Sequence, residues 1–380
     1  ILAELGYPKG RPITRSAAHQ IAQLLGGHHG FFHKALERKM LAAVDQWVPG
    51  LGGPSWAEQR YLHVAALRKL TGAEEVLTEP LPADVVAFVA GLTVAADWLA
   101  SQEDVVRQTL PPAGWVATPS ALAAHWAKTT ERASTIVRRA RLGRAIFPER
   151  SFSEQFPRIR TPNQLQQDLA DQLPALAQGG AGLLMITAPT GDGKTEAALH
   201  AASVLARASG ASGLFFALPT MATADAMHRR IREFVGTSVT GDTALTLVHS
   251  MSWLASVSSA DQDHTAFDGV LTEEAVTRTE AGRWLSTSRR GLLAPLATGT
   301  IDQGLTAVLP VRFNMLRLLG LSNKVFVVDE AHAYGPWMHS LLVRLLEWLG
   351  AMGAPVVLMS ATLAGRTASS LVEAYRRGAG

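Results

Sequence analysis

The sequence predicts two folds in one chain of 380 residues, an all-α region followed by an α/β region with a parallel sheet. The first hundred residues space their apolar side chains at three and four and contain few alternating β-branched runs, which is typical of helices. From Phe152 onward, short apolar runs alternate with helical stretches, which indicates a parallel sheet with helices on its faces. The length allows two domains. We place them at residues 1–110 and 151–380, with a linker and connecting helix in 111–150.

The composition limits the chemistry and the location of the protein. The chain contains no cysteine, which excludes disulfides, thiolate nucleophiles and metal sites built on sulfur, and fits a reducing cytoplasm. The formal net charge of +3 is too small to identify a nucleic-acid partner by itself. The most hydrophobic tract is broken by Arg344 and Glu347, and no apolar run approaches the ~18 uninterrupted residues of a membrane span. We therefore expect a cytoplasmic protein without a membrane partner.

Four stretches of the front half have the pattern of helices. Residues 15–27 end in a Gly-Gly pair that can serve as a C-cap, and residues 33–48 show helical apolar spacing. Residues 84–101 are nearly all apolar, so we expect a buried helix. Ser120 is a candidate N-cap for the helix 121–145. The arginines near its end fit both cations at a helix C-terminus and a nucleic-acid contact, and the sequence does not decide between them.

A strand, a glycine-bearing loop and a helix follow one another after residue 182. The apolar strand Leu183–Thr187 enters a loop that ends in Lys-Thr at the start of the helix. In this arrangement the loop amides and the helix N-terminus point at a phosphate chain. We expect Lys194 to neutralise the β- and γ-phosphates of ATP, and Thr195 to place its hydroxyl on Mg²⁺. The predicted nucleotide-binding residues of this loop are Ala188, Pro189, Thr190, Gly191, Asp192, Gly193, Lys194 and Thr195.

Two carboxylates follow a second apolar strand. Val325–Val328 delivers Asp329 and Glu330 to its carboxyl end, where ligands bind in parallel sheets. We expect Asp329 to hold Mg²⁺, generally through water, and Glu330 to orient or deprotonate the attacking water. His332 completes the run D-E-A-H. A third strand leads into Ser-Ala-Thr at residues 360–362, a weak signal alone but a strong one after the other two.

In this order the three motifs resemble those of superfamily 2 DExH helicases, which carry them on strands of one RecA-like domain. Many helicases use the loop form A-P-T-G-x-G-K-T, so Ala188 in place of the strict glycine is a mild departure. The resemblance implies adenine recognition by Gln166. It implies coupling roles for His332, Ser360 and Thr362. It implies contacts to single-stranded DNA by Pro219, Thr220, Thr298, Gly299 and Thr300.

One subfamily resembles the chain more closely. The run GTIDQGLTAVLPVRFNMLRLLGLSNKVFVVDEAHAY, residues 299–334, is similar to the CRISPR-associated helicase-nuclease of type I systems. This resemblance implies an ATP-driven enzyme that moves 3′ to 5′ along single-stranded DNA and nicks it. It also implies recruitment to the R-loop of a guide-RNA surveillance complex. The alternatives are a DExH helicase outside CRISPR, with an unrelated helical domain in front, and a P-loop scaffold that has lost turnover.

The same resemblance implies an HD nuclease domain in the front half. GGHHG and VAADWLAS match late HD elements, so we expect His28, His29 and Asp97 to bind divalent transition metals, two ions of Fe, Mn, Co or Ni. The nearby His33 fits an ordinary residue of the following helix. No histidine precedes His19, and no second RecA-like domain follows the Ser-Ala-Thr run. We therefore expect part of a longer protein, incomplete alone for both activities; a degenerate homologue is the alternative.

Overall fold

The computed structural model of the chain divides into two compact units, Ile1–Ile136 and Val137–Gly380. The structure describes residues 16–30, 54–73, 75–248, 284–285, 289–362 and 365–380. The division falls within one long helix, inside the range 111–150 that the sequence assigns to a linker and connecting helix. The domain limits themselves stay a prediction.

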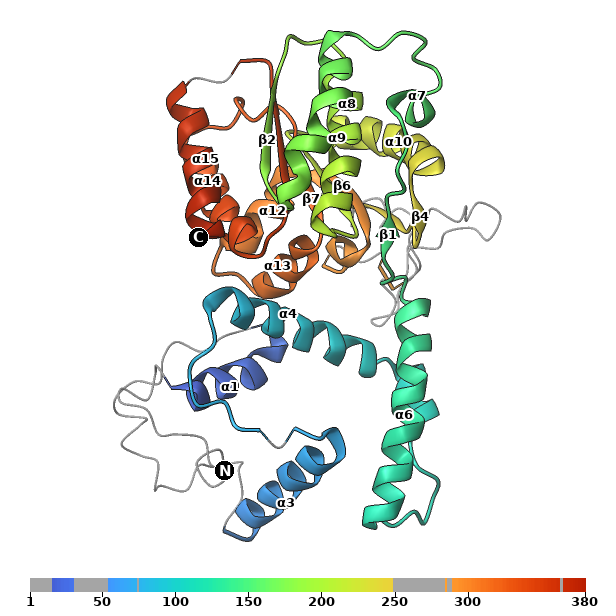
Figure 1. Ribbon diagram of the computed structural model, residues 1–380. Coiled ribbons are helices and arrows are strands. Elements are labelled where there is room, and N and C mark those ends of the chain that lie inside the picture. The colour runs from blue at the N-terminus through green and yellow to red at the C-terminus, as the bar shows by residue number, and fades with distance from the viewer. Residues whose placement is uncertain (1–15, 31–53, 74, 249–283, 286–288, 363–364) are drawn as a thin grey trace. The chain divides into compact units, whose positions relative to one another are not determined.

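The described part of the first unit consists of helices and their connections, in agreement with the all-α prediction (Figure 1). Among its described residues no strand occurs. The elements are α1 (Ala17–Gly26), the 3₁₀ turn η2 (Gly27–His29), α3 (Pro54–Thr71), α4 (Ala83–Ala100), α5 (Glu103–Thr109) and most of α6 (Pro119–Arg139). The helix predicted at residues 33–48 lies outside the described residues.

Hydrogen bonds satisfy backbone groups at both ends of α1. Ser16 is its N-cap, and the hydroxyl accepts from the amide of His19 at 3.2 Å. The Gly-Gly pair was predicted to end the helical segment, but the 3₁₀ turn η2 extends it by three residues. Gly30 then ends η2 with a left-handed φ of 85°. Gln20 connects α1 to the segment before α4, since its side chain donates to the carbonyl of Leu81 and accepts from its amide.

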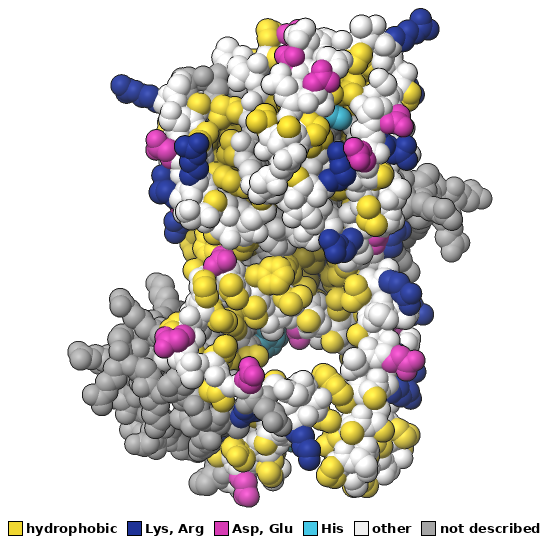
Figure 2. All heavy atoms as spheres, in the orientation of Figure 1, with side chains coloured by type: hydrophobic (Ala, Val, Ile, Leu, Met, Phe, Trp, Pro, Cys, Tyr) yellow, Lys and Arg dark blue, Asp and Glu magenta, His cyan; other side chains and the backbone are white. Residues whose placement is uncertain are grey.

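Only one face of α4 is buried. The buried residues are Ala87, Ala90, Gly91, Val94 and Ala95. Phe88 and Leu92 are 41% and 50% exposed, and Figure 2 shows hydrophobic side chains gathered over this helix. The prediction of a buried helix is therefore correct for one face and wrong for the other. By length and composition α4 could cross a membrane, but the core helix of a soluble protein meets the same criteria, so no membrane assignment follows.

The helix α6 begins earlier than predicted. Pro119 is its first residue, where a missing amide costs no hydrogen bond. The hydroxyl of Thr118 accepts from the amide of Ala121 at 3.2 Å. Thr118 therefore caps the helix, and Ser120, the predicted cap, lies inside its first turn. The helix also ends earlier than predicted, at Arg139.

Six parallel strands form the sheet of the second unit, in the order β2-β8-β7-β3-β6-β5. They are β2 (Leu183–Thr187), β3 (Leu214–Leu218), β5 (Leu245–Val248), β6 (Leu296–Thr300), β7 (Val325–Val328) and β8 (Val356–Ser360). The register aligns their carboxyl ends, as in the pairing of Thr187 with Ser360. A separate antiparallel pair joins β1 (Ala145–Ile146) to β4 (Thr240–Gly241). The predicted α/β fold with a parallel sheet is confirmed.

Helices cover both faces of this sheet. One layer contains α8 (Gln164–Leu176), α9 (Lys194–Ser209) and α10 (Met221–Ser238), and the other contains α12 (Ile301–Leu305), α13 (Asn314–Ser322), α14 (Pro336–Ala351) and α15 (Gly365–Ala379). The short elements are α7 (Phe152–Gln155), η3 (Ala177–Gly179), η4 (Gly291–Leu293) and η5 (Thr306–Val308). Successive strand residues point to opposite faces. Phe216 therefore joins the core against α9 and α10, whereas Phe215 stacks on Phe326, with ring centroids 5.6 Å apart.

The last two helices, α14 and α15, pack at a distance that only glycine permits. A Cβ at Gly378 would lie 1.9 Å from the carbonyl oxygen of Glu347, and one at Gly350 would lie 2.2 Å from that of Tyr375. Both obstacles are backbone atoms, which cannot rotate away as the end of a side chain can. The two glycines therefore set the spacing of this helix pair.

We expect Gly378→Ala to lower the stability of the second unit, because the added methyl forces α14 and α15 apart at a cost on the order of 1–3 kcal/mol. Gly236→Ala in α10 is the matched control, since no atom lies within 4 Å of the new methyl. Alanine there should stabilise the helix by ~0.5–1 kcal/mol. Urea unfolding should shift in opposite directions for the two variants, and an unchanged midpoint for Gly378→Ala would contradict the close packing.

Candidate active site

The loop between β2 and α9 has the backbone shape of a phosphate-binding loop. Gly191 and Gly193 have φ angles of 94° and 68°, in the left-handed region that favours glycine. A Cβ at Gly193 would also lie 2.3 Å from Nε2 of Gln166, so that side chain would have to move. The backbone conformation of this loop therefore depends on its glycines.

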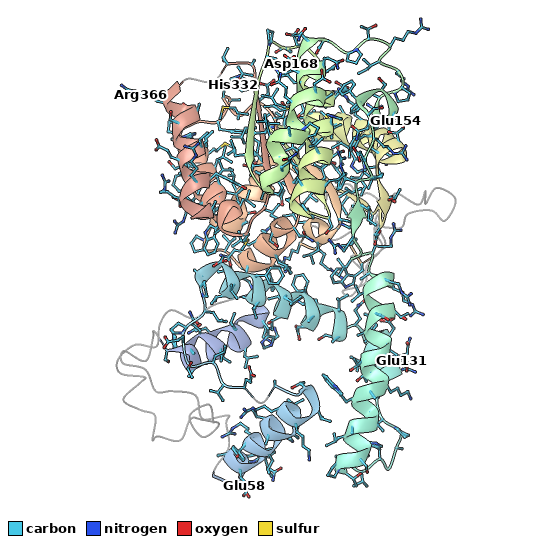
Figure 3. The ribbon with its side chains drawn as sticks, viewed as in Figure 1. Glu58, Glu131, Glu154, Asp168, His332 and Arg366 are labelled. Atoms are coloured by element: carbon cyan, nitrogen blue, oxygen red, sulfur yellow. The ribbon has the colours of Figure 1, made fainter. Side chains whose placement is uncertain are left out.

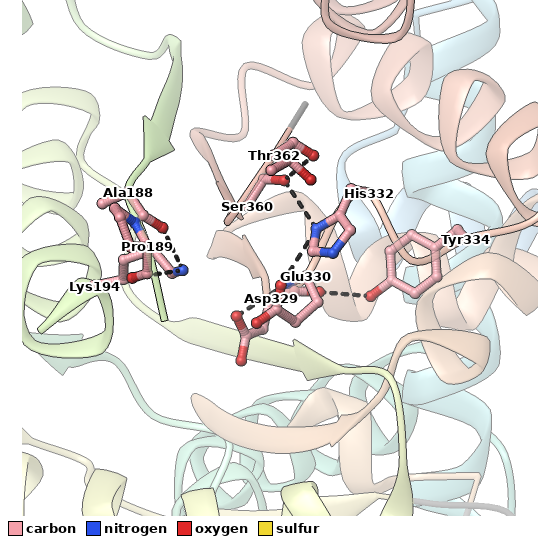
Figure 4. A network of polar contacts seen from close by, with 9 residues as sticks. All are labelled: Ala188, Pro189, Lys194, Asp329, Glu330, His332, Tyr334, Ser360 and Thr362. Atoms are coloured by element: carbon pink, nitrogen blue, oxygen red, sulfur yellow. Dashed lines mark hydrogen bonds and ion pairs between the residues drawn. The ribbon is translucent and has the colours of Figure 1, made fainter. Parts of the chain in front are cut away.

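Lys194 is buried at the start of α9 and points back into this loop (Figure 4). Its ammonium donates to the carbonyl oxygen of Ala188 at 2.6 Å and to that of Pro189 at 3.2 Å. An ammonium has three N–H donors, so one remains for a ligand. The loop thus holds a cation at the place where the sequence predicts the phosphates.

The two predicted carboxylates follow β7 directly. Oδ1 of Asp329 accepts from the amide of Glu330 at 2.9 Å, and its carbonyl oxygen accepts from the hydroxyl of Tyr334 at 2.8 Å (Figure 4). Burial, and then the neighbouring charge of Glu330, raise the pKa of Asp329. A bound cation would oppose both effects. Glu330 itself has a φ of 51°, which places a non-glycine residue in the left-handed region.

His332 connects the second carboxylate to the Ser-Ala-Thr strand (Figure 4). Its Nδ1 lies 3.0 Å from Oγ of Ser360 and 3.3 Å from Oε2 of Glu330. The hydroxyl of Ser360 donates its single proton to the carbonyl of Thr362 at 2.9 Å, so Nδ1 of His332 must be the donor to Ser360. Within the described residues, Oε2 of Glu330 is buried and makes no hydrogen bond. The residues predicted to couple hydrolysis to movement therefore form one network.

A cavity of about 410 Å³ brings the predicted ATP residues together. Lys194, Thr195, Asp329 and Glu330 all line it. Hydroxyl and carboxylate oxygens are ligands that Mg²⁺ accepts, and an ammonium suits phosphate oxygens. Glu330 adds a second carboxylate to the wall of the cavity, and a carboxylate can accept a hydrogen bond from a water molecule. The residues of the cavity therefore fit Mg²⁺ and a nucleoside triphosphate.

Gln166 lies against the phosphate loop and is not among the residues that line the cavity. It is 3% exposed on α8, and its Nε2 donates to the carbonyl oxygen of Gly193 at 3.3 Å. Asn163 donates in the same way to the carbonyl oxygen of Asp192 at 2.9 Å. Asp168, labelled in Figure 3, is exposed on another side of α8. Gln166 and Asn163 thus brace the loop, and adenine recognition by Gln166 stays a prediction.

The residues predicted to contact DNA fall into two groups. Pro219 and Thr220 follow β3, and Thr220 is exposed and caps α10 through a bond from the amide of Thr223 at 3.3 Å. The second group lies on β6 and is completely buried: Thr298, Gly299 and Thr300. The structure therefore places the first group at the surface and the second inside the sheet.

The hydroxyl of Thr298 is engaged inside the protein. It lies 2.7 Å from Nδ1 of His228 and donates to the carbonyl oxygen of Thr246 at 3.4 Å. Burial, and then the charge of Arg232, lower the pKa of His228 to about 4, so this imidazole is neutral at pH 7. The buried hydroxyl of Thr300 has no hydrogen-bond partner within the described residues. Contacts of these β6 residues with DNA stay a prediction.

The described part of the predicted HD site contains no complete set of metal ligands. His28 and His29 lie in η2, with ring centroids 4.1 Å apart, and Nδ1 of His28 is 2.5 Å from the carbonyl oxygen of Leu25. Asp97 is half-buried on α4. Among the described residues, no three His, Asp or Glu side chains form a group that could hold a metal ion. These residues do not by themselves fit a two-metal site, and their ligand roles stay predictions; His33 lies outside the described residues.

Two charged residues of the cavity are missing from the sequence predictions, Glu196 and Arg230. Glu196 follows Thr195 in the first turn of α9, where an acidic residue is ordinary. Arg230 shares a face of α10 with Thr223 and Met227, which the helical spacing in the sequence already indicates. The sequence does not indicate that this face of α10 lines the cavity, because that depends on the order of the strands in the sheet.

Two families match the chain. Residues 2–106 match Cas3, HD domain, and residues 169–371 match DEAD/DEAH box helicase. The chain is 35% identical to the CRISPR-associated endonuclease/helicase Cas3 of Thermus thermophilus, over 99% of this chain and 39% of that protein.

Solved structures agree with these matches. A crystal structure of T. fusca Cas3 with ADP superposes with a TM-score of 0.84 at 43% identity, covering 100% of this chain and 40% of that one. A chain in a pre-nicking CRISPR RNA-guided surveillance complex gives a TM-score of 0.70 at 39% identity, covering 100% and 36%. The chain thus spans well under half the length of these relatives. The helicase match covers more than half of the chain, which therefore belongs to the DEAD/DEAH box helicases and carries a Cas3 HD domain in front of the helicase domain.

Proposed function

We propose that the second unit hydrolyses ATP to drive movement along single-stranded DNA. The observation that carries this proposal is the cavity where Lys194, Thr195, Asp329 and Glu330 meet at the carboxyl ends of the strands. The match to the helicase family supports it. When bound with ATP, Mg²⁺ supplies charge that neutralises the phosphate oxygens, and Thr195 and Asp329 are the residues that would hold it.

The side chains of the cavity have separate tasks in this proposal. The remaining N–H of the Lys194 ammonium donates to phosphate oxygens, while its other two bonds fix the loop. The carboxylate of Glu330 accepts a hydrogen bond from the attacking water and orients it, because this side chain lines the cavity beside Asp329. His332 joins this carboxylate to Ser360. A change at Glu330 during hydrolysis therefore reaches the Ser-Ala-Thr segment and Thr362 through one imidazole.

The relatives extend the proposal to CRISPR interference. The Cas3 HD match over residues 2–106 favours this role over a helicase with an unrelated helical domain in front. A similar chain occurs in a pre-nicking CRISPR RNA-guided surveillance complex. We propose that the whole protein is cytoplasmic, joins the R-loop of a type I guide-RNA complex, and nicks and degrades single-stranded DNA. Divalent transition metal (Fe, Mn, Co or Ni) would serve the nuclease, with ligands that include His28, His29 and Asp97.

Lys194→Ala and Glu330→Gln should separate nucleotide binding from turnover. Lys194→Ala removes the cation of the phosphate loop, so affinity for the non-hydrolysable analogue AMPPNP should fall by about tenfold or more.

Glu330→Gln should keep nucleotide binding but slow DNA-stimulated ATP hydrolysis by roughly 10²–10⁴-fold, because the attacking water loses its acceptor. Calorimetry and a phosphate-release assay measure the two effects. The control Lys128→Ala removes an exposed lysine from α6 and should change neither; normal hydrolysis in both test variants would refute the assignment.

Asp329→Asn should stabilise the unliganded protein at neutral pH. The raised pKa of Asp329 means that the folded chain binds the proton more tightly than the unfolded chain. Wild-type stability therefore falls as the pH rises through the interval between the ordinary and the raised pKa. The variant lacks this loss, so it should melt higher at pH 7, and the difference should vanish at low pH. Asp168→Asn, on the exposed side of α8, is the control for loss of one carboxylate; an equal gain there would contradict a burial cost at Asp329.

His29→Ala and Asp97→Ala should lower the transition-metal content of the purified protein and its cleavage of single-stranded DNA, without slowing ATP hydrolysis. The reason is the proposed ligand role of both side chains in the HD domain. Elemental analysis measures the metal directly. His63→Ala is the matched control, because it removes an exposed histidine from α3 in the same unit. Unchanged metal content in the test variants would remove both residues from the metal site.

A further inference from the structure

The cavity contains a second cation besides Lys194. Arg230 lines it together with three carboxylates, those of Glu196, Asp329 and Glu330. Neither the sequence motifs nor the roles proposed above use this arginine. A polyphosphate is attracted to cations, and Arg230 is one of the two cationic side chains among the lining residues, the other being Lys194.

The position of Arg230 follows from the geometry of α10. Thr223, Met227 and Arg230 are spaced by four and three residues, which places them on one side of a helix, and all three line the cavity. Arg229, one residue earlier, points elsewhere by about a quarter turn, is exposed and is not among the lining residues. The two arginines thus differ in direction while sharing helix, charge and size.

An ion pair holds the guanidinium of Arg230 at the wall of the cavity. One of its terminal nitrogens pairs with Oε1 of Glu196, the residue that follows Thr195 in α9. A guanidinium has five N–H donors in a planar fork, so a pair with one carboxylate leaves donors for a second partner. The side chain remains 46% exposed. Arg230 can therefore hold Glu196 and still donate to an anion in the cavity.

We propose that Arg230 binds the phosphates of the nucleotide directly, as a second cation supplied by α10. This inference rests on the ATP site proposed above. The charge of Arg230 also acts on Asp329, whose pKa it lowers against the larger effects of burial and of Glu330. The same helix is capped by Thr220, one of the predicted DNA contacts. Binding of nucleotide by Arg230 thus attaches the phosphates to the helix that carries this predicted contact at its N-terminus.

The test compares Arg230→Gln with Arg229→Gln in the full chain, by calorimetric titration with AMPPNP and Mg²⁺. Arg230→Gln should weaken binding roughly tenfold, the loss expected for one charge-assisted hydrogen bond, whereas Arg229→Gln should stay within about twofold. Arg230→Lys keeps the charge but not the fork, so its affinity should lie between wild type and Arg230→Gln. Equal affinities of the two glutamine variants, at matched melting temperatures, would overturn the proposal.

A double variant distinguishes direct contact from simple neutralisation of Glu196. If Arg230 binds phosphate, Arg230→Gln with Glu196→Gln should remain weak. If affinity returns in the double variant, Arg230 acts only on Glu196 and the proposal fails. Lys194→Ala separates this failure from failure of the ATP site itself: lost AMPPNP binding in Lys194→Ala with normal binding in Arg230→Gln rejects only the role of Arg230, whereas normal binding in both rejects the site.

Discussion

The parallel pairing of β2, β8 and β7 is the constraint on which the candidate active site depends. β8 lies between the strand that enters the phosphate loop and the strand that delivers the carboxylates. The hydrogen bonds of the sheet continue into both loops, because the amide of Ala188 donates to the carbonyl of Ser360 and that of Ala331 to the carbonyl of Met359. A slip of one residue in either pairing would send side chains to the opposite face. The distance between the phosphate loop and the two carboxylates is thus fixed by the pairing of the strands.

The helix α10 connects the candidate nucleotide cavity to the sheet. One side of it closes the nucleotide cavity from Thr223 to Arg230, while His228 bonds to Thr298 inside the sheet. Its exposed cap, Thr220, belongs to the predicted DNA surface. A neutral, half-buried imidazole is well suited to the internal contact, since it hydrogen-bonds to Thr298 without bringing a charge against the sheet. The candidate nucleotide cavity, the sheet and the predicted DNA contact Thr220 are therefore connected by one helix.

Local motifs were predictable from the sequence, and relations between distant segments were not. The phosphate loop and the pair Asp329–Glu330 depend on neighbouring residues, so their strands and chemistry could be read directly. The role of Gln166 against Gly193 and the cavity position of Arg230 depend on strand order, which composition and spacing leave undetermined. The start of α6 was misplaced because Thr118 and a following proline compete successfully with Ser120 as a cap. The ligand roles of the histidine pair stay a prediction for the same reason, since no group of metal ligands forms around it among the described residues.

Glu330 illustrates how chemistry and folding make opposite demands on one position. Its left-handed backbone is a conformation that glycine adopts freely and that costs other residues on the order of 1–3 kcal/mol. Its buried carboxylate oxygen makes no hydrogen bond within the described residues, a second cost. Glycine at this position would relieve the backbone cost and would also remove the carboxylate. The position thus combines a costly backbone angle with a costly buried oxygen, a combination that proteins concentrate at functional sites.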